Sequence, residues 1–295
     1  MTIKEQEDYW RKYAKQNTKM ERLAYYVMLW AFRDAVYPVI NSLESVGVQQ
    51  TLDTLDGLFE RKAIQIAYGK LYLAVGEKHK QWTDSDTRSR FTRKKDLIFK
   101  DEEDDKYNRR PKPSILTQTP VETNFGIGFY NPVWLARLKQ IVNNIDVAER
   151  ITSVTDTIKK DIRKSLQQAQ QEFVSIRKIT ARLRRDLGIF SRRRAEVIAR
   201  TEVTYIANEA AEQSAYEVAQ EVGIKLKKIW IHTRDSRTRD SHRAVSSKPI
   251  DSNEAFRVGG KLMQKPGDPA GGASQVINCR CAIAYIPADD TEGFE

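Results

Sequence analysis

The sequence predicts a mainly α protein with a small α+β module at its C-terminal end. Apolar residues recur at helical spacing over much of the chain before Gly223, whereas clear strand-like runs occur only after it. Glycine and proline pairs typical of loops are concentrated in the same C-terminal part. With 295 residues, of which 40% are hydrophobic, the chain can bury at least one sizeable core. We therefore expect long amphipathic helices followed by a short-stranded, loop-rich domain.

Residues 1–76 are expected to form an N-terminal helical region. A first helix should run from about Gln6 to Tyr37, where Pro38 would end or kink it. A second helix is expected from Thr51 to Val75. Aromatic residues are dense in this region, and we expect them to pack against one another or against a partner protein.

Residues 77–130 are densely charged with mixed sign. Their carboxylates show neither the regular ligand spacing nor the turn glycine of a calcium-binding loop. We interpret this stretch as an exposed, charged connection or mobile arm.

Residues 131–222 are expected to form a basic helical region with three helices. Asn131 and Pro132 suit the N-cap and the first position of a helix. Apolar residues from Val147 to Phe173 recur at spacings of three and four, which predicts one long amphipathic helix. A second helix is expected to end at Gly188, and a third helix to follow it.

Nearly all of the net charge of +10 lies in one part of this region. Between Ile158 and Arg200 there are 13 Lys or Arg residues against 4 Asp or Glu residues. Such a basic stripe indicates a polyanionic partner, and we expect non-specific contact with genomic DNA. The alternative is a solvated helix face beside an acidic neighbour. The candidate DNA-binding residues are Lys159, Lys160, Arg163, Lys164, Arg182, Arg184, Arg185, Arg192, Arg193 and Arg194.

Three consecutive arginines, residues 192–194, are expected in the first turn of the third helix. The positive end of the helix dipole disfavours cations there by a few tenths of a kcal/mol each. A nearby anion, such as a phosphate or an acidic partner protein, would remove this penalty. The alternative is that the helix begins later and the arginines lie in solvent.

Residues 223–287 are expected to fold as a small α+β module, with residues 288–295 as a tail. Strands are predicted at Lys227–Thr233 and Ala282–Ile286, with a loop-rich stretch between them. A module of this size with so few apolar residues needs a cross-linking group or a partner surface to be stable.

Both cysteines and two of the three histidines of the chain lie in this module. Cys279 and Cys281, as thiolates, and His242 could supply three ligands to Zn²⁺, with Asp235 or Asp268 as the fourth. Alternate residues of a strand point to the same face, so the two cysteines can share a ligand. The alternative is that both thiols pack as small buried hydrophobic groups.

A structural network is expected around these residues. Asp235, Arg237 and Arg239 should form salt bridges and hydrogen bonds that fix the loop before His242. A catalytic alternative would make His242 a general base and the arginines an anion clamp, but no nucleophile stands out. The expected members of the network are Trp230, Asp235, Arg237, Arg239, Asp268 and Asn278.

The sequence gives two indications of where the chain is made. Two cysteines one residue apart cannot make a disulfide framework, which is typical of synthesis in a reducing cytoplasm. No stretch has the pattern of a signal peptide or the length of a membrane span. We expect no contact with a membrane.

Taken in order, the motifs from about residue 175 to 286 resemble the minor head, or head morphogenesis, proteins of tailed bacteriophages, the phage Mu F-like family. The matching elements agree in order and spacing, although none is specific alone. They include Arg194-Ala-Glu-Val-Ile-Ala-Arg-Thr-Glu202, Lys228-x-Trp230, Asp235-x-Arg237-x-Arg239-x-x-His242, Pro266-Gly-Asp268-Pro and Val276-Ile-Asn-Cys-Arg-Cys281. The first 130 residues carry no motif that matches.

The resemblance implies a structural component of the virion rather than an enzyme. Such a protein would be made in the host cytoplasm and would lie inside the phage head near the portal vertex. Its expected partners are the portal protein, other head proteins and the genomic DNA, with an influence on assembly, packaging or ejection.

Two other kinds of function remain as alternatives. One is a metal-dependent enzyme, either a nuclease or an ADP-ribosyltransferase-like protein. The transferase needs an active-site glutamate, and only Glu254, Glu292 and Glu295 follow Gly223. The other alternative is a zinc-containing nucleic-acid-binding protein, which no finger spacing or helix-turn-helix pattern supports.

Overall fold

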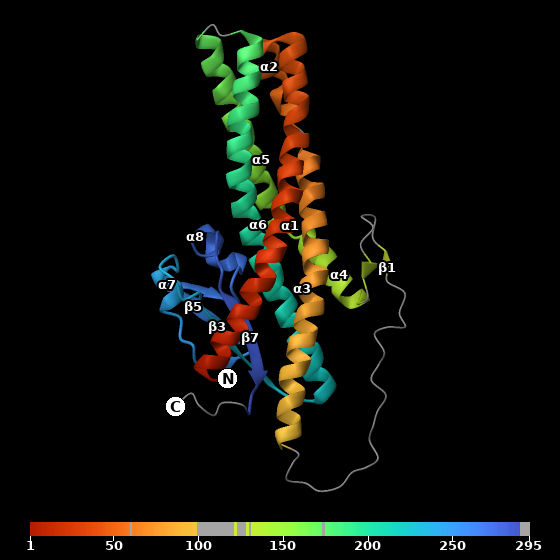
Figure 1. Cartoon of the computed structure of the whole chain (residues 1–295), viewed down its shortest axis with the longest axis vertical. Coiled ribbons are helices and arrows are strands. Elements are labelled where there is room, and N and C mark those ends of the chain that lie inside the picture. The colour runs from red at the N-terminus through yellow and green to blue at the C-terminus, as the bar shows by residue number, and fades with distance from the viewer. Residues whose placement is uncertain (60, 99–120, 123–127, 130, 173–174, 290–295) are drawn as a thin grey trace.

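The computed structural model describes residues 1–59, 61–98, 121–122, 128–129, 131–172 and 175–289. Long helices lie side by side along the molecule, and a small module of strands and short helices packs beside one end of them (Figure 1). The predicted fold class, mainly α with a small α+β C-terminal module, is confirmed. The long helices are α1 (Ile3–Val46), α3 (Arg61–Ile98), α5 (Ile145–Gln171) and α6 (Ile176–Val222), and the shorter helices before the module are α2 (Val48–Leu58) and α4 (Pro132–Val142).

The strands are short except for two. β3 (Leu226–Ile231) pairs antiparallel with β7 (Ala282–Pro287), and Trp230 lies opposite Ile283. β4 (Ile250–Asp251) adds to the other edge of β3. The remaining elements are the pairs β1 (Val121–Glu122) with β2 (Gly128–Phe129) and β5 (Phe256–Val258) with β6 (Lys261–Met263), and the short helices α7 (Asp240–Arg243), η3 (Pro269–Gly271) and α8 (Gly272–Val276).

The apolar core is continuous through α1, α3, α5 and α6. Each face of the β3–β7 sheet has its own buried cluster, because alternate residues of a strand point to opposite faces. One face carries Trp230, Ile283 and Tyr285, which pack with the last turns of α6 and with both cysteines. The other face carries Ile229 and Ala284 and packs against the N-terminal end of α1. The module is therefore joined to the helices on both sides of its sheet.

Several predicted boundaries are confirmed. The side chain of Asn131 caps α4 by accepting a hydrogen bond from Trp134 N, and Pro132 stands at its first position. The predicted amphipathic helix is α5, and both predicted strands are present as β3 and β7. Gly223 ends α6 in the left-handed conformation, with φ 72°.

The predicted helix ends at Pro38 and Gly188 are wrong. α1 continues through Pro38 to Val46, which leaves only the alternative of a kink at that residue, and α6 is one helix of 47 residues that passes through Gly188. A glycine inside a helix costs about 1 kcal/mol relative to alanine. The apolar residues on either side of Gly188 pack against one common core, which offsets that cost. The arginines at 192–194 therefore lie in the middle of a helix, and the argument from its dipole does not apply to them.

The extent of the N-terminal helices also differs from the prediction. The helix expected at 51–75 is divided between α2 and α3, and residues 77–98 continue α3 instead of forming an exposed arm. Polar residues of this part face inward with partners: Lys80 binds Asp84 and Glu217 at 2.6 Å, and Thr83 bonds to Ser214. Apart from β1 and β2, the rest of the predicted connection up to residue 130 lies outside the described residues, as do residues 290–295 of the predicted tail.

No helix in the described part of the chain has the combination of length and apolar character that crossing a membrane requires.

Candidate metal centre and basic surfaces

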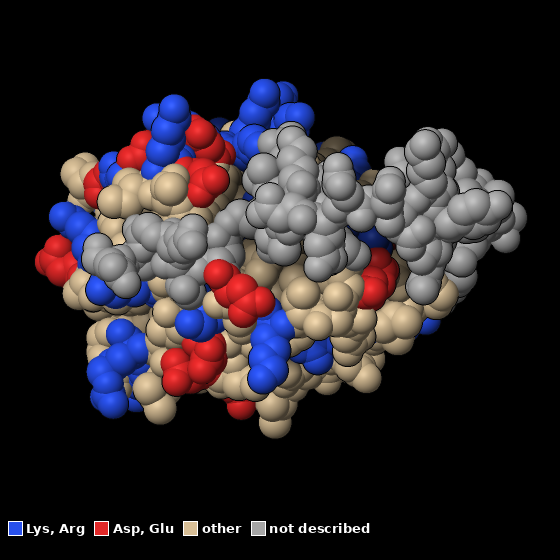
Figure 2. Space-filling view, turned by 90° about the horizontal axis from the view of Figure 1, so that it is seen from below, with Lys and Arg blue, Asp and Glu red and all other residues tan. Residues whose placement is uncertain are grey.

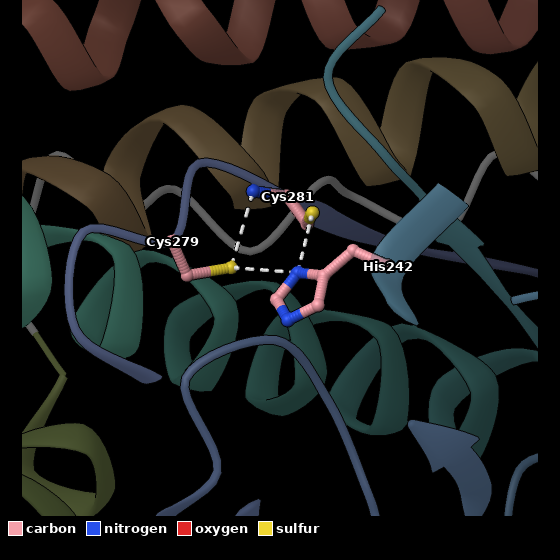
Figure 3. Close-up of side chains that lie close together, drawn as sticks. All are labelled: His242, Cys279 and Cys281. Carbon is pink, nitrogen blue, oxygen red and sulfur yellow. Dashed lines mark hydrogen bonds between the residues drawn. The ribbon is translucent and has the colours of Figure 1, made fainter. Parts of the chain in front are cut away.

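His242, Cys279 and Cys281 converge on one point inside the module (Figure 3). His242 comes from α7, and the two cysteines come from the turn that leads into β7. His242 Nδ1 lies 3.4 Å from Cys281 Sγ and 3.7 Å from Cys279 Sγ. All three side chains are buried, at 1% to 2% exposure. The structure thus brings together three of the four predicted metal ligands.

A second contact orients the ring of His242 and selects its tautomer. Its Nε2 lies 3.1 Å from Gln275 Oε1, which also accepts a hydrogen bond from Ser241 Oγ at 2.8 Å. An amide oxygen only accepts, so Nε2 carries the ring proton and Nδ1 presents its lone pair to the two sulfur atoms. Trp230 packs edge-on against the same ring, with centroids 5.5 Å apart.

The two thiols differ in acidity because they interact. The pKa of Cys279 lies well below its usual value, chiefly through a hydrogen bond from Cys281, while burial opposes the shift. The pKa of Cys281 lies well above its usual value, chiefly through the same hydrogen bond. The backbone N–H of Cys281 also donates to Cys279 Sγ at 3.5 Å. Cys279 is therefore the thiol that ionises first.

Asp235, predicted as a further ligand, lies outside the cluster. Its carboxylate accepts two hydrogen bonds from Arg280, at 2.7 and 2.9 Å, and one from the backbone N–H of Arg237. The Arg280 hydrogen bonds hold the pKa of Asp235 far below its usual value. Asp268, the alternative fourth ligand, accepts hydrogen bonds from the backbone N–H groups of Gln264 and Ala270. Neither carboxylate belongs to the group of potential ligands around His242.

The other expected members of the structural network have separate tasks. Arg239 donates to the carbonyl of Ile277, while the guanidinium of Arg237 lies mostly in solvent, 3.6 Å from Asp235. Asn278 takes the left-handed conformation, with φ 59°, and accepts a hydrogen bond from Arg200. The central ion pair, between Asp235 and Arg280, includes an arginine that sequence reasoning did not select.

Residues of α6 hold the cysteine turn in place, and sequence reasoning missed their roles. Thr204 Oγ1 donates to the carbonyl of Cys279 at 2.8 Å. Asn208 Nδ2 donates to the carbonyls of Pro266 and Cys281, and Asn208 Oδ1 accepts from Ile283 N at 2.8 Å. The sequence alone does not indicate what the side chain of Asn208 does, and the fold explains it.

α1 contacts the same turn from the other side. Tyr9 donates to the carbonyl of Ile283 at 2.9 Å, and Tyr13 to that of Cys281 at 3.4 Å. Trp10 Nε1 donates to the carbonyl of Arg280 at 3.3 Å. These aromatic residues of the N-terminal region therefore pack against the module of the same chain.

The loop between β6 and η3 lies close to α6. Gly267 has φ 88°, and a Cβ atom at this position would lie 3.0 Å from Tyr205 Cα. Only glycine allows this conformation together with this close approach. The Pro-Gly-Asp-Pro motif is thus explained by packing against α6.

The predicted DNA-binding segment is largely neutralised by neighbouring carboxylates. Lys159 and Arg163 pair with Asp56 of α2, at 3.3 and 3.4 Å, and Arg184 pairs with Glu44 of α1. Arg182, Arg185 and Arg194 also have carboxylate partners, so six of the ten predicted residues are paired. Lys160, Lys164, Arg192 and Arg193 are exposed and form no ion pair with a described residue.

A second line of cations lies along α1. Lys12, Lys15, Lys19 and Arg22 are spaced by three and four residues, so they share one face of the helix. All four are exposed, and none forms an ion pair with a described residue. Elsewhere the charges mix, as on the face seen in Figure 2, where basic and acidic side chains are interspersed. A count of charge along the sequence missed this line because acidic residues occupy other positions of the same helix.

A cavity of about 570 Å³ lies between α5, α6 and α8. Its lining is mainly apolar and includes Val154, Ile198 and Val276, with Arg193 and Arg194 also contributing. Neither a histidine nor a cysteine lines it, so it is separate from the cluster around His242.

Residues 158–284 match the family described as Phage Mu protein F like protein. This part of the chain, the Mu F-like region, is similar to that family. The match contains the second half of α5, all of α6 and the module as far as β7, so it includes the cysteine turn and the helix that holds it. The resemblance expected from the motifs is therefore confirmed for the Mu F-like region.

Two curated relatives match parts of the chain. Minor head protein GP7 of Bacillus phage SPP1 is 33% identical over 94 residues, which are 32% of this chain and 30% of that protein. The NAD(+)-arginine ADP-ribosyltransferase EFV of Enterococcus faecalis is 37% identical over 89 residues, 30% of this chain and 18% of that protein. The chain thus spans less than a third of the length of either relative, and no solved structure matches it.

Proposed function

We propose that this chain is a structural head morphogenesis protein of a tailed phage and is carried in the virion. The observation that supports this most is the match of residues 158–284 to the Mu F-like family together with the similarity to a minor head protein. The residues that hold the cysteine turn, such as Thr204 and Asn208, lie within this match. The family likeness thus extends over one coherent structural unit, made of α6 and the module.

The test of this proposal is a phage that lacks the gene. Heads produced without the protein should differ from wild-type heads in composition, volume or DNA content, and the protein supplied from a plasmid should restore them. The protein should also co-purify with intact wild-type heads after free protein is removed. Heads of normal composition, size and DNA content in the deletion strain would count against the proposal.

We also propose the portal protein and other head proteins as partners. Support comes from α1, where Tyr26, Trp30 and Tyr37 are 48% to 59% exposed and lie on one helix face. Exposed Tyr and Trp side chains are typical of protein interfaces. Binding of the purified chain to purified portal protein, measured by biolayer interferometry, would test this, and a lack of binding at micromolar concentration would contradict it.

Contact with DNA is proposed through the exposed cations of α5 and α6. The ion pair between Arg194 and Asp161 joins the two helices, which brings Lys160, Lys164, Arg192 and Arg193 to neighbouring turns. Replacing all four by Gln should lower the salt dependence of duplex DNA binding by about three to four units in the log–log slope, about 0.9 per phosphate contact. Fluorescence anisotropy at several salt concentrations measures this slope.

The matched control removes the same number of charges from α1. A variant with Gln at positions 12, 15, 19 and 22 loses four exposed cations from another surface. We expect it to keep the wild-type slope. If the salt dependence of DNA binding decreased in the α1 variant and stayed at the wild-type value in the α5/α6 variant, the DNA surface would lie on α1. The proposal for α5 and α6 would then be wrong.

An enzymatic function is the second candidate, because one relative is named as an NAD(+)-arginine ADP-ribosyltransferase. The chain spans 18% of that protein, so we do not carry its activity over. Glu254 is the one glutamate after Gly223 within the described residues. We expect no transfer of ADP-ribose from NAD⁺ to an arginine substrate; labelled NAD⁺ would detect it, and turnover would favour the enzyme.

A further inference from the structure

We propose that His242, Cys279 and Cys281 bind one Zn²⁺ ion that stabilises the C-terminal module. The proposal concerns these residues of the chain and does not depend on a role in the phage head. It rests on the spacing of the three donor atoms, on the groups that orient them and on the charge of the complex they would form.

The donor atoms have the spacing of a zinc site. Zn²⁺ binds thiolate at about 2.3 Å and imidazole at about 2.0–2.1 Å in tetrahedral geometry, which sets the N···S separation at about 3.6 Å. The observed separations, 3.4 Å to Cys281 Sγ and 3.7 Å to Cys279 Sγ, fall on either side of that value. All three donor atoms lie within 4.8 Å of one another. One ion can therefore reach all three without a change of backbone.

The surroundings of His242 match those of a metal-binding imidazole. Ligating histidines donate their other ring N–H to an acceptor, which fixes the ring and its tautomer. His242 Nε2 has such an acceptor in Gln275 Oε1, and Ser241 holds the same oxygen from the other side. The nitrogen that faces the sulfur atoms is therefore the unprotonated one.

A metal ion would replace the hydrogen bonds within this cluster. The single lone pair of His242 Nδ1 can accept one proton, so only one of the two thiols within reach can donate to it at a time. A metal ion would engage both sulfur atoms and the nitrogen together. The backbone N–H of Cys281, which points at Cys279 Sγ, would then donate to a thiolate, which is the stronger acceptor.

The charge of the complex suits its buried position. Two thiolates and one neutral imidazole around Zn²⁺ carry no net charge, whereas a buried thiolate without a metal is an uncompensated anion. The cluster lies against Trp230, Phe256 and Ile283, all of them buried. A neutral complex avoids the desolvation cost that a charged group would meet there.

A metal here would join two parts of the module that local sequence does not connect. His242 lies on α7 after β3, and the cysteines lie 37 and 39 residues later, before β7. The segment between them contains only strands of two or three residues and short helices, so few backbone hydrogen bonds between strands hold it in place. Structural Zn²⁺ contributes directly to the stability of small modules of this kind.

The fourth position would be filled from outside the described histidines, cysteines and carboxylates. Asp235 is engaged by Arg280, and the described residues place no other such side chain within the group. In Zn²⁺ sites with three protein ligands, which are typical of catalytic zinc, a water molecule occupies the fourth position.

The experiment uses the full chain, produced in zinc-supplemented medium. It is purified under reducing conditions and without metal-affinity chromatography. Elemental analysis should find about one zinc ion per chain in the wild type and less than about a tenth of that in Cys279→Ser and Cys281→Ser. His232→Gln is the matched control, because His232 lies outside the cluster and should leave the zinc content unchanged. Removal of the metal by a chelator should lower the melting temperature of the wild type and of His232→Gln, but not that of Cys279→Ser.

A second measurement covers the case in which the serine variants fail to fold. Wild-type protein stripped of metal and loaded with Co²⁺ should develop a thiolate-to-cobalt charge-transfer band and the visible bands of a tetrahedral site. Zn²⁺ added afterwards should remove both. Folded wild-type protein with reduced cysteines that holds no zinc and gives no such bands would overturn the proposal.

Discussion

The helical bundle is held together by a continuous apolar core, whereas the C-terminal module, in addition to its two smaller apolar clusters, is fastened by buried polar side chains that reach its loops from α6 and α1. In the bundle, residues such as Leu71, Ile162 and Leu166 are fully buried and pack at helical spacing. In the module, Asn208 and Thr204 bond to backbone groups about 75 residues away in sequence.

This difference changes how each region should respond to substitution. An apolar core distributes its stability over many contacts, so that one lost contact is partly compensated by its neighbours. A buried polar side chain that satisfies several backbone groups concentrates its contribution, because its removal leaves those groups without partners. The module should therefore be sensitive to polar substitutions that the bundle tolerates.

The largest effect is expected for Asn208→Ala. The variant removes hydrogen bonds to three backbone groups of the module, those of Pro266, Cys281 and Ile283, of which the Cys281 carbonyl keeps Tyr13 as a partner. We expect a loss of about 3 kcal/mol in the free energy of unfolding, measured by urea denaturation. Asn17→Ala on α1 is the matched control: Asn17 is also buried, but its side-chain oxygen has no partner among the described residues and its hydrogen bond is with a single group, the Tyr13 hydroxyl, so the loss should be about 1 kcal/mol. Equal losses of unfolding free energy in the two variants would show that the module depends no more on buried polar side chains than the bundle does.

His79 provides a test of the contact between the helical bundle and the C-terminal module. It lies on α3, is fully buried, and neither ring nitrogen has a hydrogen-bond partner among the described residues. It packs against Tyr13, which bonds to the cysteine turn, and against Trp82. Burial lowers the pKa of His79 to about 3.

The lowered pKa makes stability depend on pH in a defined direction. Below about pH 6.5 the unfolded chain binds a proton at this histidine and the folded chain does not, so stability falls as the pH drops from about 6.5 towards 3. Between pH 7 and pH 5 the wild type should lose about 2 kcal/mol more than His79→Phe. Comparing the change with pH, rather than stability at one pH, cancels the packing effect of the substitution. Parallel pH profiles of the two proteins would show that His79 can take up a proton without unfolding.

The sequence was sufficient to predict elements that depend on local periodicity. The spacing of apolar residues gave α5, and the β-branched and aromatic runs gave β3 and β7. The same local rules failed at Gly188 and at Pro38, where contacts on both sides keep the helix continuous. The density of charge predicts a connection or arm over 77–130, but residues 77–98 continue α3, where Lys80 has its partners on the next turn and on α6.

The candidate site could be predicted in part. The rarity of cysteine and histidine was enough to select His242, Cys279 and Cys281, and the fold brings them together. The role of Gln275 could not be found in this way, because it depends on how α8 packs against α7. The partner of Asp235 was missed for a similar reason: Arg280 reaches it from a residue 45 positions away.

The smallest change in stability is expected for the replacement of two buried threonines, one that contacts the module and one within the bundle. Thr204 on α6 donates to the carbonyl of Cys279, in the module, whereas Thr155 on α5 donates at 2.7 Å to the carbonyl of Ile151, in its own helix. Valine keeps the shape of either side chain and removes the hydroxyl. Thr204→Val should cost about 1 kcal/mol, because the turn carbonyl loses a buried donor. Thr155→Val should change stability by less than about 0.5 kcal/mol, because the Ile151 carbonyl keeps its place in the helix ladder. Urea denaturation of both variants measures the difference, and a Thr155→Val cost equal to that of Thr204→Val would mean that the module has no special dependence on polar contacts from α6.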